Sequence, residues 1–243
     1  MIETRIHEDI FLKYPTFRRG IVAAKTIHNR DLSKALDTAL KKAIAEAAEH
    51  PIDLKTDPRM TVWNDAHRQF GSNPNKFPPA HGALLKRVQK PGASIPFINK
   101  VVAIMNINSI QGITPVGGDD VGGMDPCLEL RYAKGEESFT PLGRPEIVER
   151  PNPGEIIYVV EKSNEVMCRR WNWRNGHKTR ITEDTQSMVM NIDTLGEDSE
   201  EKAVFWRDRV AGMLEEFCQA DIATALLSPS QPSCQFDDRL SQE

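Results

Sequence analysis

The chain has 243 residues, of which 39% are hydrophobic and 27% charged, and its formal net charge at pH 7 is −4. These values predict one large globular domain with enough residues to bury a core. No apolar run reaches the roughly eighteen residues that a membrane-spanning helix needs. The acidic balance also excludes a protein whose whole surface attracts nucleic acid, so an anionic partner would need a local basic patch.

The N-terminus and the cysteines indicate the compartment. The first eleven residues carry three acidic side chains and no apolar segment, so we expect no signal peptide and a cytoplasmic protein. The four cysteines are too widely spaced for a zinc motif, and we expect reduced thiols and no metal. They are Cys127, Cys168, Cys218 and Cys234.

Residues 20–109 alternate between apolar segments and turn signals. Residues 20–27 predict a short buried strand, and the three- and four-residue spacing of Leu and Ala over 32–47 predicts a helix capped by Asp31 and ended by Pro51. Further helices are expected over 59–70, 81–89 and 96–109, with Pro96 in the first turn of the last. The segment 71–79 is rich in Gly, Asn and Pro and predicts a loop.

After residue 113 the pattern changes to short segments rich in β-forming residues. We expect strands over 127–132, 155–160, 165–170 and 188–192. Asp198 is expected to open a final helix, with Glu201 completing a capping box. The tail from 228 onward is rich in Ser, Pro, Gln and Asp, and its composition predicts disorder.

The glycine-rich segment GGDDVGG at 117–123 does not fit a known phosphate-binding loop. It lacks the Lys-Ser/Thr ending of a P-loop and the spacing of a dinucleotide fingerprint, and its two carboxylates would repel phosphate. We therefore expect a tight turn with a charged tip, and no cofactor.

Aromatic and cationic residues concentrate in MCRRWNWRNGHKTRITEDT, residues 167–185. If the strand from 165 continues to 174, Trp171 and Trp173 point to one side, and Arg170, Asn172 and Arg174 point to the other. Arginine forks suit phosphates and aromatic faces can stack nucleobases, which favours a binding surface. Alternatively, both tryptophans fill the core and the arginines pair with nearby acidic residues, which are Glu183 and Asp184.

Further basic residues lie upstream, most of them on the polar faces of expected helices. Because solvated helix faces usually carry charge, they do not by themselves define a site. They are Arg59, His67, Arg68, Lys76, Lys86, Arg87 and Lys90.

Four segments resemble the B3/B4 tRNA-editing domain family: 63–88, 98–120, 128–143 and 154–185. The most specific match is the Arg-Trp-Asn-Trp-Arg block followed by Thr-x-Ile-Thr-Glu-Asp-Thr. The family occurs in the β subunit of bacterial phenylalanyl-tRNA synthetase and as freestanding proteins, and this sequence resembles the freestanding kind. The resemblance is strong over 60–193.

The resemblance implies an α+β fold, a mixed sheet flanked by helices in a single domain with an extra C-terminal helix. The expected organisation is an N-terminal strand and helix over 1–58 that belong to the same domain, and a B3/B4-like domain over 59–195. A C-terminal helix over 196–227 and the disordered tail 228–243 follow.

The activity that the resemblance implies is hydrolysis of the ester in mischarged tRNA by a trans-acting deacylase. Such an ester is already activated, so positioning a water against its carbonyl would supply much of the acceleration. Glu137 aligns with a glutamate that lines the amino-acid pocket, where it would anchor the substrate ammonium or orient the water. Asn172 and backbone N–H groups near Thr182 would stabilise the oxyanion.

The resemblance also implies residues that hold the RNA. Trp171 or Trp173 would stack the terminal adenine, and the terminal phosphates would be held by Arg170, Arg174 and Lys178. Asn99 is the early asparagine of the family pattern, and Thr185 ends its last motif. The implied partner is the aminoacylated 3′ end of tRNA, with no DNA and no membrane, whereas the oligomeric state is not defined by the sequence.

Other interpretations stay open. Glu137 would otherwise be a solvated turn residue, Asn172 a structural hydrogen-bond donor, and Thr182 and Thr185 residues that close a turn. The family has Asp and His where this chain has Ala103 and Gly117. A non-catalytic binder of tRNA or other RNA, or a sensor of an amino acid or small metabolite, therefore remains an alternative.

Overall fold

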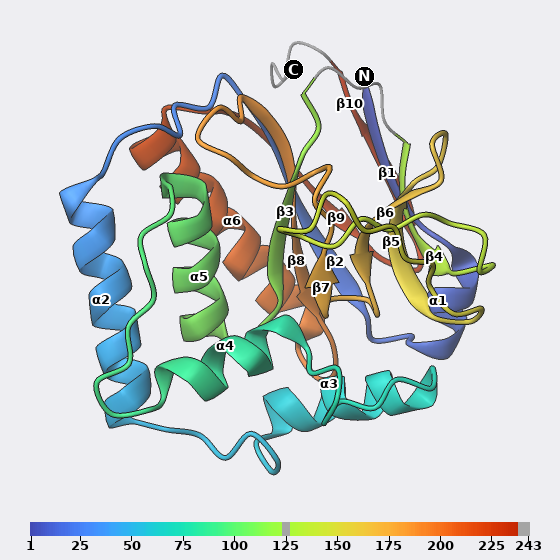
Figure 1. The fold of residues 1–243 in the computed structure, drawn as a ribbon, viewed down its shortest axis with the longest axis horizontal. Helices are drawn as coiled ribbons and strands as arrows, with labels where there is room; N and C mark the ends of the chain where they lie inside the picture. Colours follow the sequence, from blue (N-terminus) through green and yellow to red (C-terminus); the bar gives the residue numbers. More distant parts are fainter. Residues whose placement is uncertain (123–126, 238–243) are drawn as a thin grey trace.

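The protein folds into two β-sheets with helices packed around them (Figure 1). This is a computed structural model, and it describes residues 1–122 and 127–237. The expected α+β class, a mixed sheet flanked by helices with an extra C-terminal helix, is confirmed.

One sheet has four antiparallel strands in the order β3-β8-β2-β9. Strand β2 pairs with a neighbour on each side, β8 and β9, and its six central residues are buried. In the register Gly20 faces Ile192 and Gly117 faces Asn191. The strands are β2 (Arg18–Lys25), β3 (Val116–Asp120), β8 (Ser187–Thr194) and β9 (Asp221–Leu227).

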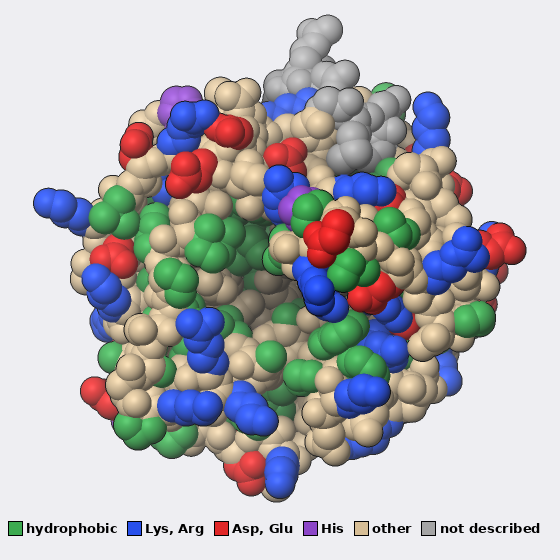
Figure 2. All heavy atoms as spheres, viewed as in Figure 1, with side chains coloured by type: hydrophobic (Ala, Val, Ile, Leu, Met, Phe, Trp, Pro, Cys, Tyr) green, Lys and Arg blue, Asp and Glu red, His purple; other side chains and the backbone are tan. Residues whose placement is uncertain are grey.

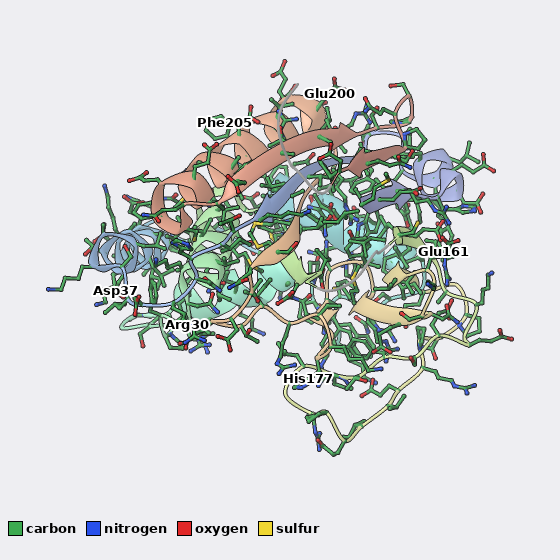
Figure 3. The ribbon with its side chains drawn as sticks, turned by 90° about the horizontal axis from the view of Figure 1, so that it is seen from above. Arg30, Asp37, Glu161, His177, Glu200 and Phe205 are labelled. Atoms are coloured by element: carbon green, nitrogen blue, oxygen red, sulfur yellow. The ribbon has the colours of Figure 1, made fainter. Side chains whose placement is uncertain are left out.

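Helices cover the outer face of this sheet. Because side chains alternate along a strand, Val22 and Ala24 of β2 face a core shared with α2, α5 and α6, while Ile21 and Ala23 face the other way. Figure 3 shows α6, which carries Glu200 and Phe205, lying along the outside of the sheet. The helices are α2 (Lys34–Glu49), α4 (Ala80–Val88), α5 (Lys100–Gly112) and α6 (Ser199–Cys218).

The second sheet has six strands in the order β10-β1-β4-β5-β6-β7. Strands β1 and β4 run parallel and the other neighbours are antiparallel. The apolar run IIYVV makes β5 the buried centre of the sheet, as expected for a strand covered on both faces. The strands are β1 (Ile2–Ile6), β4 (Cys127–Tyr132), β5 (Ile156–Val160), β6 (Glu165–Arg169), β7 (Arg174–Asn175) and β10 (Ser233–Phe236).

A shared core joins the two sheets. Ile21 and Ala23 of β2 and Val189 of β8 pack in one cluster with Leu130 and Tyr158 of the six-stranded sheet. Helices α1 (Glu8–Lys13) and α3 (Pro58–Gln69) close this cluster at its sides. Strand β2 therefore separates two cores and fixes the position of one sheet against the other.

Most expected helices and strands are present, but the residues that cap the helices, and the start of one helix, differ from the expectation. The cap of α2 is Ser33, whose Oγ accepts a hydrogen bond from Leu36 N, rather than Asp31. Helix α5 begins at Lys100 and not in the region of Pro96, because Asn99 Oδ1 accepts from Val102 N at 2.9 Å. Asp198 does precede α6, but its side chain makes no capping bond, so the capping box with Glu201 is not formed.

Two expectations are wrong. Residues 117–120 are not a tight turn but belong to β3, because they pair with β8; Gly123 lies outside the described residues. The segment after α6 is not all helix or disorder, because β9 pairs with β2 and β10 pairs with β1. The strands with which β9 and β10 pair are far away in the sequence, so the composition of the C-terminal segment alone could not predict these two strands. Residues 238–243 lie outside the described residues.

Candidate functional site

The aromatic and cationic block forms a reversal of the chain and not a continuous strand. Strand β6 ends at Arg169, and Arg170 and Trp171 have φ values of 49° and 66°. Residue Arg174 then pairs with Arg169 in the antiparallel β7. The expected alternation of side chains over 170–174 is therefore wrong, because two residues in the left-handed region turn the backbone.

Trp171 belongs to the core. Its side chain is 2% exposed and its ring makes edge contacts with Tyr14, Phe17 and Trp63 at centroid distances of 4.9, 4.9 and 5.2 Å. Its indole Nε1 donates to Asp193 Oδ2 at 3.2 Å. A ring enclosed in this way is not available to stack an adenine. Trp173 is half-buried, against the edge of Phe77.

The three cations expected to hold phosphates pair with glutamates of this chain, although not with Glu183 or Asp184. The partners are Glu155 for Arg170 at 3.5 Å, Glu149 for Arg174 at 3.9 Å, and Glu165 for Lys178 at 2.7 Å. The Arg170 guanidinium also lies 3.9 Å from the centroid of the Phe77 ring. The structure thus gives Arg170 a packing role, and leaves Arg174 and Lys178 at the surface with partial neutralisation.

Glu137 holds a turn. Its carboxylate is buried, accepts from Lys134 N at 2.9 Å and Gly135 N at 2.8 Å, and pairs with Arg131. Burial alone would raise the pKa of Glu137, but these donors outweigh it and lower the pKa to about 2. The Glu137 carboxylate is therefore already occupied by donors of the protein, and a substrate ammonium could bind to it only by replacing them.

The threonines of the Thr-Glu-Asp-Thr motif also close a turn. Thr182 N donates to Thr185 Oγ1 at 2.9 Å, and Thr185 Oγ1 donates to Asp120 Oδ2 at 2.7 Å. Asn29 links this turn to α5, since its Nδ2 donates to Thr182 O and its Oδ1 accepts from Val101 N. The Thr182 N–H is therefore not free to stabilise an oxyanion.

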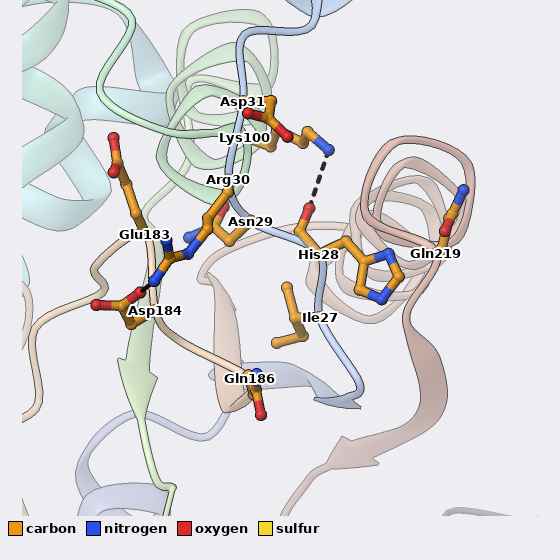
Figure 4. Close-up of a pocket in the computed structure, with 10 residues that line it drawn as sticks. All are labelled: Ile27, His28, Asn29, Arg30, Asp31, Lys100, Glu183, Asp184, Gln186 and Gln219. Carbon is orange, nitrogen blue, oxygen red and sulfur yellow. Dashed lines mark hydrogen bonds and ion pairs between the residues drawn. The ribbon is translucent and has the colours of Figure 1, made fainter.

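Beside this turn lies a surface groove of about 360 Å³ (Figure 4). Arg30 and Asp184 on its walls form an ion pair, and Lys100 Nζ donates to the His28 carbonyl at 3.0 Å. Two further carboxylates on its walls, Asp31 and Glu183, have no cationic partner among the described residues, so the unpaired acidic groups of this groove would repel an RNA phosphate.

A smaller cavity of about 70 Å³ lies between the two sheets. Figure 2 shows a hollow in the middle of this face, with hydrophobic side chains at its floor, where β3 and β8 lie in Figure 1. The cavity is lined from both sheets, from the start of α4 and from the 171–175 reversal. Six of the lining residues matter below: Arg19, Ala80, Gly117, Asp119, Asn172 and Asn191.

Buried charges line this cavity. Arg19 is 2% exposed and makes a two-bond contact with Asp193, at 2.6 Å from Nε and 2.8 Å from Nη2. Asp119 is also buried, and its Oδ1 accepts from Thr179 Oγ1 at 2.6 Å. Burial raises the pKa of Asp119 to about 6 despite this hydrogen bond. The cavity therefore holds a carboxyl group that changes charge near neutral pH.

Several buried hydrogen-bonding atoms at the cavity residues have no partner. They are Asn172 Nδ2, Arg19 Nη1 and Asn191 Oδ1. Asn172 is held from its other side, where Oδ1 lies 3.1 Å from His67 Nε2. Since buried polar groups in folded proteins are nearly always paired, two donors and one acceptor without partners, all on residues that line one cavity, indicate a polar ligand or bound water.

Two buried histidines support this wall. Burial lowers the pKa of His67 to about 4 and that of His81 to about 3, so both rings are neutral at pH 7. His67 fixes Asn172, whereas both ring nitrogens of His81 lack a partner. The 171–175 reversal is thus held by α3 through the uncharged His67 ring, and by α4 through Ala80 N, which donates to Asn172 O at 2.8 Å.

The comparison with protein families decides what kind of domain this is. Residues 62–205, more than half of the chain, match the family model of the B3/4 domain. The chain belongs to the B3/4 domain family.

A solved structure also resembles the B3/4 chain. It is an N-terminal fragment of the phenylalanyl-tRNA synthetase β-subunit from Pyrococcus horikoshii, 11% identical, with a TM-score of 0.44. The match covers 91% of this chain and 50% of that fragment, so the chain spans half the length of the protein it matches. The comparison with curated proteins gave no match.

The residues of the B3/4 cavity were mostly missed from the sequence. Arg19 stands at the start of an apolar strand and Asp119 within GGDDVGG, and neither position suggested burial. A signal was present, since a charged residue inside a buried strand must find a partner. Of the two departures from the family pattern, Gly117 lines the cavity and Ala103 packs in the core of α5.

Neither a membrane span nor a metal centre is evident in residues 1–122 and 127–237 of the B3/4 chain. No helix there is both long enough and apolar enough to cross a bilayer. Within the same ranges, no three His, Cys, Asp or Glu side chains come together as metal ligands.

Proposed function

We propose that this B3/4 chain is a trans-acting aminoacyl-tRNA deacylase, and that the aminoacyl end enters the cavity between the two sheets. The resemblance to tRNA-editing domains supports tRNA as the substrate. The observation that carries the proposal is the set of unpartnered atoms around the cavity: Asn172 Nδ2, Arg19 Nη1 and Asn191 Oδ1. An ester carbonyl can accept from the first two, and an ammonium can donate to the third.

The proposed reaction uses the two donors for the charge that develops on the carbonyl. The oxygen of a water bonds to the ester carbon, and Asn172 and Arg19 stabilise the resulting oxyanion. Helix α4 begins at Ala80 on the cavity wall, and its first N–H donates to the Asn172 carbonyl at 2.8 Å, which holds Asn172 in place for this role.

Asp119 is the proposed general base. Its pKa of about 6 leaves it ionised at neutral pH and close to the value at which proton transfer is efficient. It takes a proton from the attacking water and gives that proton to the ribose oxygen as the bond from the carbonyl carbon to this oxygen breaks. The products are the free amino acid and tRNA. Asn172 keeps its expected role, while Asp119 and Arg19 replace Glu137 and Thr182.

Two neighbouring glycines of β3 provide the test. A Cβ added at Gly117, which lines the cavity, meets nothing within 4 Å, whereas one at Gly118 meets Met105 Sδ and Met190 Cε at 3.5 and 3.6 Å. Both changes have the same effect on the unfolded chain. Gly117→Ala should therefore intrude on the substrate and slow deacylation by about tenfold or more, while Gly118→Ala should remain close to wild type.

The assay is release of labelled amino acid from a panel of mischarged tRNAs, with the melting temperature as a control for folding. Survival of every substrate at high enzyme concentration, or equal rates in the two glycine variants, would rule the proposal out.

A small-metabolite sensor is the second candidate. The 70 Å³ cavity, with two donors and an acceptor on the residues that line it, would also suit a free amino acid. A rise in melting temperature with an amino acid, abolished by Gly117→Ala and without any deacylation, would support the sensor instead.

A further inference from the structure

One long segment of the chain contains no acidic residue. Between Asp65 and Asp119 there is no Asp or Glu, although the whole chain has more acidic than basic residues, 35 against 31. The same segment carries six Lys or Arg residues: Arg68, Lys76, Lys86, Arg87, Lys90 and Lys100. An acidic protein thus concentrates positive charge in one segment, which includes α4.

Four of these cations are exposed and have no acidic partner. Within the described ranges, no carboxylate lies within ion-pair distance of Lys76, Lys86, Arg87 or Lys90. On α2, by contrast, Lys41 and Lys42 pair with acidic residues one turn away, at 2.6 and 3.7 Å. The unpaired cations are therefore free to attract an anionic partner.

The exposed side of α4 leads from the cavity to these cations. Ala80, Ala83 and Arg87 are exposed at steps of three and four residues, so they share one face, and Ala80 lines the cavity. At about 1.5 Å per residue, Arg87 lies roughly 10 Å along the helix from Ala80. Figure 2 shows Lys and Arg side chains gathered beside the hollow on the side where α4 lies.

The helix dipole does not account for the whole set. Cations in the last turn stabilise a helix, which explains Lys86 and Arg87 in part. Lys76 and Lys90, however, lie outside α4 on either side of it. The two alanines on the exposed face let an extended strand approach the helix closely, and none of the large exposed hydrophobic residues that a lipid surface would require lies in α4.

We infer that Lys76, Lys86, Arg87 and Lys90, the basic residues in and beside α4, bind the phosphates of a single-stranded RNA end whose last nucleotide reaches the cavity. The inference rests on the proposed function for the identity of that RNA, as the 3′ end of tRNA. The cavity would hold the esterified end, and the cations would hold phosphates farther back along the strand.

The test compares two triple variants that remove equal charge. In one, Lys86, Arg87 and Lys90 are replaced by Gln; in the control, Lys34, Lys41 and Lys42 of α2 are. The binding of a short single-stranded RNA that carries no amino acid is measured by fluorescence anisotropy over a range of salt concentrations. Each phosphate contact contributes about 0.7 to the logarithmic salt slope, so three lost contacts should lower the slope by about two and weaken binding about 100-fold at 0.1 M salt. The control should bind like wild type.

A minimal substrate separates this inference from the proposed function. An aminoacyl ester of adenosine has no preceding phosphates, so the α4 variant should hydrolyse it at the wild-type rate while losing activity on tRNA. If no ester is cleaved by any variant, the deacylase proposal fails but the RNA-binding comparison still decides this inference. Equal loss of binding in both triple variants, no RNA binding by the wild type, or binding only to vesicles with anionic lipids would overturn it.

Discussion

Replacing Asp119 by Asn should stabilise the folded protein, and by an amount that depends on pH. The pKa of Asp119 is raised from 3.8 to about 6, and each unit corresponds to about 1.36 kcal/mol. Keeping this carboxylate ionised in the fold therefore opposes folding by about 3 kcal/mol at neutral pH. Asn keeps an oxygen for the Thr179 hydroxyl but adds an N–H pair, which reduces the expected gain to about 1–3 kcal/mol.

The pH window follows from the sign of the shift. Because the folded pKa lies above the unfolded value, the folded state binds more protons between pH 3.8 and 6, and wild-type stability falls as pH rises through that range. His67 and His81 have lowered pKa values and act in the opposite direction, but they are present in both proteins. The difference between Asp119→Asn and wild type isolates Asp119.

Urea unfolding followed by tryptophan fluorescence at a series of pH values measures this difference. The gain from Asp119→Asn should be small near pH 4, grow up to about pH 6 and stay constant above pH 7. A gain that is equal at pH 4 and pH 8, or a variant less stable than wild type at pH 8, would refute the reasoning. Loss of deacylation together with a gain in stability is the pattern expected of a functional buried carboxylate.

Two further substitutions test the surroundings of the site. Glu137→Gln removes the charge that holds Arg131 and two backbone N–H groups, so it should lower the free energy of unfolding by about 2–4 kcal/mol; an unchanged urea midpoint would contradict the turn-holding role. His81→Phe removes two unpartnered ring nitrogens and should raise the free energy of unfolding by about 1–3 kcal/mol at pH 7. Because the pKa of His81 is lowered to about 3, that gain should increase as pH falls below 6.5, and calorimetry showing the reverse trend would contradict it.

Local patterns predicted much of the fold. The helix expected over 59–70 is observed as Pro58–Gln69, because an aspartate cap followed by proline is a strong local start signal. The strand expected over 127–132 is observed with the same bounds. In both segments the apolar spacing and the end signals lie within a few residues of each other.

The site could not be predicted in the same way, because its contacts join distant parts of the chain. Arg19 and Asp193 are 174 positions apart, and His67 and Asn172 are 105 apart. The two left-handed residues that turn the chain at Arg170 and Trp171 carry no glycine signal. The most basic and aromatic stretch of the sequence consequently suggested a binding surface, whereas one of its tryptophans fills the core.

Asp193 accepts hydrogen bonds from both Arg19 and the Trp171 indole, so one carboxylate serves the cavity wall and the centre of the hydrophobic packing. A change of charge on that wall would therefore disturb the enclosed aromatic cluster as well. At Gly117, by contrast, a new side chain would project into empty space. Homologues that prefer larger or smaller substrates should consequently vary at position 117 and conserve the arginine, aspartate and tryptophan.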